Sequence, residues 1–219
     1  MADPVVVGVD VGTTVTKAVA FAADGAALAR AARPTVLQRP APGWYEQDTD
    51  QVVGSVLKVL AELRQRVARP VRAIGVTGQG DGLWLVDDAG RPVRPAISWL
   101  DARATPVLER WGADGLLEQA YRRTGNYPFP GASGPLLAWL DRHEPDTLDR
   151  AATAAYCKDV VLQRLTGVRA TDPSDASAPF LEPRGRVYDE ELIAACGLAH
   201  RRDLLAPVRV APQGPLAAD

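Results

Sequence analysis

The stretch Val5–Lys17, VVVGVDVGTTVTK, decides the interpretation of this chain, because an apolar strand ends in a carboxylate and a glycine turn follows at once. Gly12 has no Cβ, so the backbone can approach an anion closely at this point. Thr13 and Thr14 supply hydroxyl and amide donors beside it. Asp10 would repel a phosphate directly and would instead act through a divalent cation or its water shell. The stretch therefore predicts nucleotide-dependent phosphoryl chemistry.

The turn differs from two common phosphate-binding loops. No Gly-Lys-Ser/Thr follows a five-residue gap, and the pattern G-x-G-x-x-G is absent. The alternative to a phosphate loop is a strand, a tight turn and a second strand that bind no ligand.

Length and composition describe an ordinary globular protein. The 219 residues fit one large domain or two small ones, and 47% of them are apolar. A net charge of −2 gives no electrostatic footprint for nucleic acid or an anionic membrane. Cys157 and Cys196 lack metal-ligand spacing and are expected to be buried free thiols. No apolar run approaches a membrane span and no signal peptide is evident, so we expect a cytoplasmic location.

Hydrophobic periodicity predicts strands followed by alternating helices and strands. The expected strands are residues 4–11, 17–23, 27–35, 71–77, 83–86 and 96–100. The expected helices are residues 50–67, 105–111, 115–124, 136–142, 160–166 and 190–195, whereas 171–177 reads as a polar loop. This order favours an α/β fold with a mixed sheet. Ligands bind beyond the carboxyl ends of strands in such sheets, which draws attention to the loops after Val9 and Thr77.

Seven segments in a fixed order resemble one family. They are residues 8–17, GWYEQD at 43–48, IGVTGQ at 74–79, WLDAR at 99–103, LAWL at 137–140, RLTG at 164–167 and TDPSDAS at 171–177. Together they resemble the N-terminal domain of the FGGY carbohydrate kinases over about residues 5 to 185. The resemblance implies the ribonuclease H-like fold of the actin, hexokinase and Hsp70 superfamily, with a mixed sheet flanked by helices. Residues 1–219 would then be the sugar-binding domain, without the C-terminal ATPase domain.

The resemblance also implies a reaction and its cofactors. Such a kinase transfers the γ-phosphoryl group of ATP to a hydroxyl of a small sugar or polyol, with Mg²⁺. Gly12, Thr13, Thr14 and Lys17 would contact the ATP phosphates, and Asp10 would hold the metal ion through water. Lys17 follows the turn by three residues, so a structural role is its alternative. The partners we expect are a small sugar or polyol and ATP, and a homodimer stays open as the assembly.

The substrate is predicted from the loop after Gly78. In this family Gln79 and its successors face the sugar; glycerol kinases continue with Arg-Glu and xylulose kinases with Met-His-Gly. Here Gly80-Asp81-Gly82 follows, which looks most like the erythritol kinases. Asp81 can accept hydrogen bonds from adjacent hydroxyls, and a turn-forming Asp between glycines is the alternative. A ketopentose or gluconate kinase, or a non-enzymatic sugar-binding or regulatory protein, stays open.

Five further residues complete the predicted sugar site. Trp99 offers an apolar face to C–H groups, while Asp101 and Arg103 can bind hydroxyls. An ion pair between Asp101 and Arg103 at a strand end is the alternative. Trp44 and the pair Glu46-Gln47 resemble a family segment near the sugar, although a core Trp and a carboxylate at a helix N-terminus fit equally.

The resemblance places no catalytic base in this chain. In the family the base is an aspartate that starts the second domain, and the ending Gly214–Asp219 is similar to the linker before it. We therefore expect the base beyond Asp219, and an isolated chain that binds polyol weakly without turnover.

Overall fold

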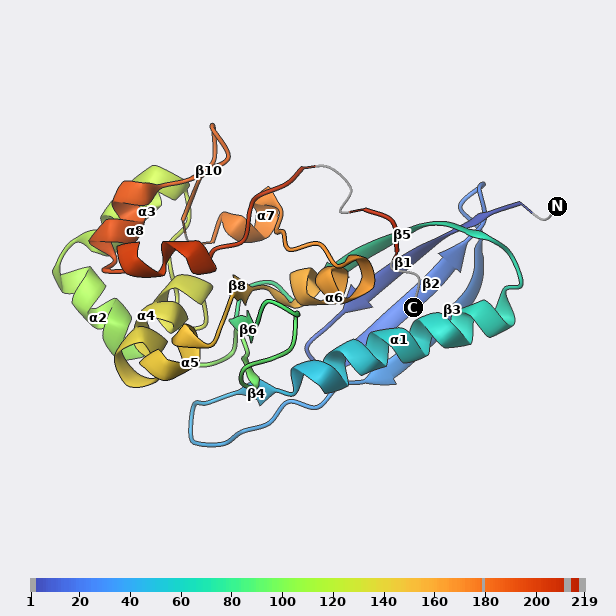
Figure 1. Cartoon of the computed structure of the whole chain (residues 1–219), viewed down its shortest axis with the longest axis horizontal. Helices are drawn as coiled ribbons and strands as arrows, with labels where there is room; N and C mark the ends of the chain where they lie inside the picture. The colour runs from blue at the N-terminus through green and yellow to red at the C-terminus, as the bar shows by residue number, and fades with distance from the viewer. Residues whose placement is uncertain (1–2, 179, 211–213, 217–219) are drawn as a thin grey trace. The chain divides into compact units, whose positions relative to one another are not determined.

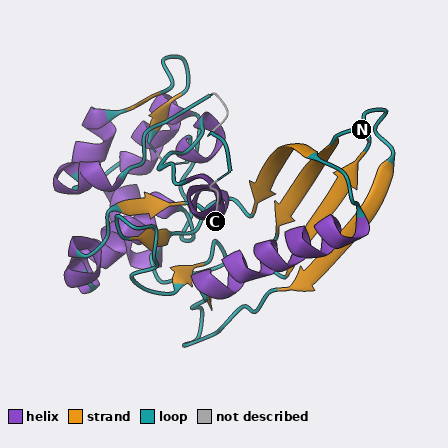
Figure 2. Cartoon of the chain, turned by 45° about the vertical axis from the view of Figure 1, so that its right-hand side comes forward, coloured by secondary structure: helices purple, strands orange, loops and turns teal. Residues whose placement is uncertain are grey.

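The computed structural model describes residues 3–178, 180–210 and 214–216, so part of the predicted linker, 217–219, lies outside the described residues. The chain forms two compact units. The first unit comprises residues 1–37 and 47–79, and the second comprises residues 38–46 and 80–219. Figures 1 and 2 show the elements of each unit.

The first unit is built on a four-stranded mixed sheet with the order β3-β2-β1-β5. Its strands are β1 (Val5–Val11), β2 (Val15–Phe21), β3 (Ala27–Pro34) and β5 (Val71–Gly78). β1 and β2 pair antiparallel, as do β2 and β3, whereas β1 and β5 are parallel. The mixed sheet expected from the sequence is confirmed.

Helix α1 (Thr49–Arg66) packs along this sheet (Figure 1). It begins because the Asp48 carboxylate accepts a hydrogen bond from the backbone N–H of Gln51. Its apolar stripe is buried, and Ser55 Oγ donates to Thr16 Oγ1 on β2 at 2.7 Å. Alternate residues of β1 are buried, so Asp10 at the end of the strand is exposed.

The second unit consists mostly of helices around an apolar core. Its helical elements are α2 (Thr105–Ala113), α3 (Leu116–Thr124), α4 (Ser133–His143), α5 (Pro145–Asp149), α6 (Cys157–Thr166), α7 (Pro173–Ala176), α8 (Glu190–Ala195) and the 3₁₀ helix η1 (Ala199–Leu204). Its strands are β6 (Trp84–Val86), β7 (Ala96–Ile97), β8 (Thr153–Ala155), β9 (Leu181–Glu182) and β10 (Val187–Tyr188), and β4 (Glu46–Gln47) lies at the boundary between the units. β6 and β8 pair antiparallel and contribute to the core, which also includes Leu83, Leu136 and Phe180.

Several sequence expectations need correction. The strand expected at 96–100 ends at Ile97, and α4 and α6 each begin three residues before the expected start. β2 begins at Val15 rather than Lys17, because its antiparallel register with β1 starts directly after the turn. Residues 171–177 are not a continuous loop, since they contain α7. Asp172 caps that helix, and Pro173 occupies its first turn. This Asp-Pro pair is a recognised helix-start signal that the loop prediction overlooked.

Both cysteines are buried, as expected, and neither takes part in a disulfide in the part of the chain that the structure describes. In the part of the chain that the structure describes, no helix combines the length and apolar character that crossing a membrane requires.

Candidate functional site

The predicted phosphate turn is a tight connection between β1 and β2. The Gly12 N–H donates to the Val15 carbonyl at 3.1 Å. A Cβ placed on Gly12 would lie 2.9 Å from the same oxygen, so only glycine fits without movement. Thr14 follows with an exposed side chain. The turn thus presents small polar residues at the carboxyl end of β1.

Two glutamines hold the turn from within the first unit. Thr13 Oγ1 donates to Gln79 Oε1 at 3.0 Å, and Gln79 Nε2 donates to Gln47 Oε1 at 2.6 Å. Gln47 Nε2 closes the ring by donating to the Thr13 carbonyl at 3.0 Å. Gln79, predicted from the sequence to face substrate, is therefore bonded to the phosphate turn. The sequence placed Gln47, together with Glu46, in a family segment near the sugar, whereas the structure bonds its side chain to this turn.

Asp10 and Lys17 face each other across the β1–β2 register. The Lys17 Nζ lies 3.9 Å from Asp10 Oδ2, and both side chains are largely exposed. Lys17 is therefore a strand residue beside Asp10 rather than a member of the turn itself.

The donor set at this end of the sheet suits a weakly held Mg²⁺ ion. Among the described residues, no group of three or more His, Cys, Asp or Glu side chains could hold a metal. Mg²⁺ usually takes one or two protein carboxylates and completes its shell with water and phosphate oxygens. The exposed Asp10 carboxylate fits that pattern.

In the second unit, Asp81 has an unusual backbone. Its φ is 55°, in the left-handed region that non-glycine residues rarely adopt. Gly82 follows with φ 73°, and its N–H donates to the Gly131 carbonyl at 2.9 Å. A Cβ on Gly82 would lie 2.6 Å from the Ile97 carbonyl. The loop is thus tightly held, and such strain is frequently found at functional sites.

The carboxyl group of Asp81 is set apart from ordinary turn residues. Its Oδ1 is shielded from solvent and has no hydrogen-bond partner in the described part of the chain. Burial, reinforced by the negative charge of Asp175, raises the pKa of Asp81 to about 6. A shielded acceptor without a donor is costly, so a ligand hydroxyl would satisfy it.

Trp99 lies next to this loop. A Cβ on Gly82 would be 3.1 Å from the Trp99 N, and one on Gly131 would be 1.8 Å from the Trp99 carbonyl. Glycines at both positions therefore let three backbone segments meet. Trp99 is 40% exposed, as is Leu100, so Trp99 is partly open to solvent.

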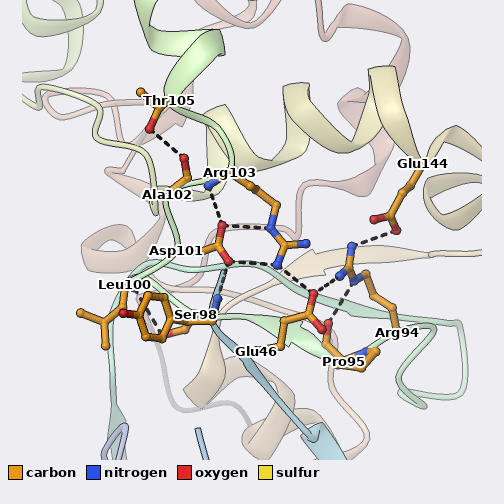
Figure 3. A network of polar contacts seen from close by, with 11 residues as sticks. Glu46, Arg94, Pro95, Ser98, Leu100, Asp101, Ala102, Arg103, Thr105 and Glu144 are labelled. Atoms are coloured by element: carbon orange, nitrogen blue, oxygen red, sulfur yellow. Dashed lines mark hydrogen bonds and ion pairs between the residues drawn. The ribbon is translucent and has the colours of Figure 1, made fainter. Parts of the chain in front are cut away.

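The remaining predicted residues form a buried ion-pair network (Figure 3). Asp101 accepts from the Arg103 N–H at 2.8 Å and from its Nε at 2.9 Å. Arg103 Nη2 also donates to Glu46 Oε1 at 2.8 Å. Glu46 receives a second guanidinium from Arg94, which in turn pairs with Glu144. The Asp101 and Arg103 side chains are 0% exposed.

An aromatic group covers one side of the network. The Arg103 Cζ lies 3.9 Å from the Trp44 ring centroid. Trp44 meets Trp139 edge to face with 5.4 Å between centroids, and Trp139 stacks on His143. Arg103 Nη1 is buried without a hydrogen-bond partner among the described residues. The structure thus brings Trp44, Asp101 and Arg103 together with Glu46 in one cluster.

A charged cluster on α6 was not predicted. The Lys158 Nζ lies 2.7 Å from Asp159 Oδ1, 2.7 Å from Asp175 Oδ2 and 3.1 Å from Asp172 Oδ2. These carboxylates raise the pKa of Lys158 above its usual range, although burial opposes this. Asp159 follows Lys158 directly, whereas Asp172 and Asp175 stand in the TDPSDAS segment, and the sequence offered no sign that Lys158 would meet these two.

Similarity to known protein families and solved structures agrees with this architecture. The pattern of the "FGGY family of carbohydrate kinases, N-terminal domain" matches residues 5–214. The chain belongs to the FGGY family of carbohydrate kinases. An erythritol kinase of Brucella abortus is 40% identical over 226 aligned positions, covering 98% of this chain and 42% of the relative. A xylulose kinase of Escherichia coli is 32% identical, and the alignment covers 88% of this chain and 40% of the relative.

Solved structures support the same fold for this FGGY chain. A xylulose kinase from Rhodospirillum rubrum superposes with a TM-score of 0.89 at 32% identity, covering 98% of this chain and 45% of that one. A gluconate kinase from Lactobacillus acidophilus gives a TM-score of 0.92 at 24% identity, over 99% and 44% of the two chains. The actin/hexokinase-like fold expected from the sequence is confirmed. The FGGY chain spans less than half the length of these relatives.

Proposed function

We propose that this FGGY chain is the sugar-binding N-terminal domain of an ATP-dependent kinase that phosphorylates a small, erythritol-like polyol. The observation that carries the proposal is the Asp81 carboxylate, whose Oδ1 is shielded and receives no hydrogen bond from any described residue. A vicinal diol offers two hydroxyl donors to one carboxylate. The exposed Trp99 indole beside the loop supplies an apolar face for the C–H groups of the same ligand.

The residues on either side of Asp81 favour a polyol over glycerol or a ketose. Gly80 replaces the arginine that glycerol kinases carry in this loop. Asp81 replaces the histidine of xylulose kinases. The 40% identity to an erythritol kinase, against 32% to a xylulose kinase, supports the same choice.

Phosphoryl transfer would use the first unit. Gly12, Thr13 and Thr14 would bind the phosphate oxygens of ATP, and Asp10 would hold Mg²⁺, which neutralises phosphate charge. The sugar hydroxyl attacks the γ-phosphorus, the bond to ADP breaks, and a general base takes the hydroxyl proton. We propose that this base belongs to a second domain beyond Asp219. Lys17 would contribute positive potential from β2.

Residues of the buried network would support the site in different ways. Asp101 and Arg103 would fix the backbone that carries Trp99, because both side chains are buried and bonded to each other. Arg103 Nη1, which has no hydrogen-bond partner within residues 3–178, 180–210 and 214–216, is the atom of this network that we propose for a substrate oxygen. Trp44 and Glu46 would orient the guanidinium.

A ketopentose such as xylulose is the second candidate substrate, because several relatives of 31–34% identity are xylulose kinases. The test is to express the whole reading frame and measure ADP release with erythritol, D-xylulose, glycerol and gluconate. A large preference for erythritol supports the proposal, and preference for xylulose replaces the substrate. No ADP release with any of them would contradict the kinase assignment. Light scattering on the same sample tests the expected homodimer.

A further inference from the structure

Asp175 connects the Lys158 cluster to the Asp81 loop. Its Oδ2 is held by Lys158 Nζ at 2.7 Å. A Cβ placed on Gly80 would find Asp175 Oδ1 at 3.9 Å and nothing closer. The missing side chain at Gly80 therefore leaves this oxygen facing the loop that carries Asp81.

The charges around this point are unbalanced. Lys158 is a single cation, yet it meets the carboxylates of Asp159, Asp172 and Asp175. Asp81 adds a fourth carboxylate close enough for Asp175 to disfavour its ionisation. The buried Tyr156 hydroxyl, which also senses both aspartates, bonds to the Ala178 carbonyl and Ser133 and brings no positive charge. The carboxylates therefore outnumber the cation, and the electrostatic potential beside the loop that carries Asp81 is negative.

We propose that Asp175, positioned by Lys158, acts with Asp81 as a specificity pair that admits uncharged polyols and rejects sugar acids. Two carboxylates can accept several hydroxyl hydrogens, whereas a ligand carboxylate would meet two like charges in a partly desolvated space. Such repulsion costs far more here than in bulk water. Gly80 contributes to this selectivity, because a longer side chain at position 80 would lie against Asp175 Oδ1.

The inference rests on the proposed location of the sugar site at Asp81, but its test needs neither ATP nor turnover. The full-length protein is titrated calorimetrically with erythritol and with erythronate, the four-carbon acid in which one end carbon is a carboxylate. We expect erythritol to bind at least about tenfold more tightly at pH 8. In Asp175→Asn, which keeps an acceptor for Lys158 but loses the charge, the ratio should fall about tenfold.

Asp149→Asn is the matched control, because Asp149 is also paired with a cation in the second unit but is largely exposed. In Asp149→Asn the ratio of erythritol affinity to erythronate affinity should equal that of the unmodified protein. A purely structural role for Asp175 would weaken both ligands equally and leave the ratio unchanged, which would overturn the inference. Equal binding of the two ligands by the unmodified protein, or no binding of erythritol, would also overturn it.

A second measurement covers the case in which Asp175→Asn does not fold. In the unmodified protein the preference for erythritol should shrink as the pH falls from 8 to 5, because Asp81 then becomes neutral. A ratio independent of pH contradicts the proposal. The kinase assignment fails separately, through absent ADP release, and selectivity without ADP release would leave the specificity pair standing.

Discussion

Asp101 accepts hydrogen bonds from both the backbone N–H and the side chain of Arg103, two residues further along the chain. The same carboxylate also accepts from the Tyr45 N–H at 2.6 Å. Asp101 therefore fixes the path of the chain after Trp99 and the orientation of the Arg103 guanidinium. The segment 99–103 can therefore combine the exposed Trp99 with the buried ion pair of Asp101 and Arg103.

Removing the buried cation should destabilise the protein strongly. Arg103→Met leaves the buried Asp101 without its cation and removes one of the two cations that contact Glu46, which should lower the free energy of unfolding by about 3–5 kcal/mol. Urea denaturation measures the change. Arg122→Met removes an exposed i,i+4 ion pair with Glu118 and should change stability little. Equal effects of the two substitutions would show that the buried network does not stabilise the fold.

Gly82 should tolerate no side chain. Gly82→Ala combines a left-handed backbone with a Cβ only 2.6 Å from the Ile97 carbonyl, and should cost roughly 2–4 kcal/mol. Gly115→Ala is the control, because its φ is 71° but nothing lies within 4 Å, and it should cost about 1–2 kcal/mol. Thermal unfolding compares them. If Gly115→Ala is as harmful, backbone conformation rather than crowding governs the loop.

Trp99 should contribute to sugar binding without contributing much to folding. Trp99→Ala removes an exposed aromatic face and should weaken polyol binding about five- to tenfold, with little change in melting temperature. Leu100→Ala is the matched control, since both residues are 40% exposed. Calorimetric titration measures the dissociation constants. Unchanged affinity in Trp99→Ala would remove the indole from the site.

Polyol binding should depend on pH through Asp81. With a pKa of about 6, this carboxyl is ionised at pH 8 but only about a tenth ionised at pH 5, so affinity should fall as the pH drops. An aspartate of ordinary pKa would remain ionised over that range. Asp175→Asn removes a like charge and should move the midpoint to lower pH. Asp81→Asn should abolish the dependence, and a profile that persists in this variant would assign it to another group.

Asp10 should affect phosphoryl transfer rather than sugar binding. In the full-length protein, Asp10→Asn should lower turnover by about a hundredfold and change the polyol dissociation constant less than twofold, because its proposed partner is Mg²⁺. Steady-state kinetics and titration separate the two effects. Asp24→Asn, in the turn before β3, should alter neither. Normal turnover in Asp10→Asn would rule out the metal role.

The sequence by itself determined the main elements, the mixed sheet and the family. The apolar alternation of β1, the cap at Asp48 and the Gly12 turn are local features, since each depends on residues a few positions apart. Asp81, in contrast, was singled out by the resemblance to the substrate loop of the family, because an Asp between glycines is by itself an ordinary turn. The local pattern failed at residues 173–176, where a short helix depends on one Asp-Pro cap.

Only the tertiary structure decided which polar residues meet. Lys158 and Asp175 are 17 positions apart, and Glu46 is 57 positions from Arg103, so nothing in the local pattern indicates that their charges are paired. Burial decided the rest. Asp101 and Trp99 stand two residues apart and both seemed suited to bind a sugar, yet folding encloses one and exposes the other. Solvent exposure and long-range electrostatics are properties of the folded chain as a whole.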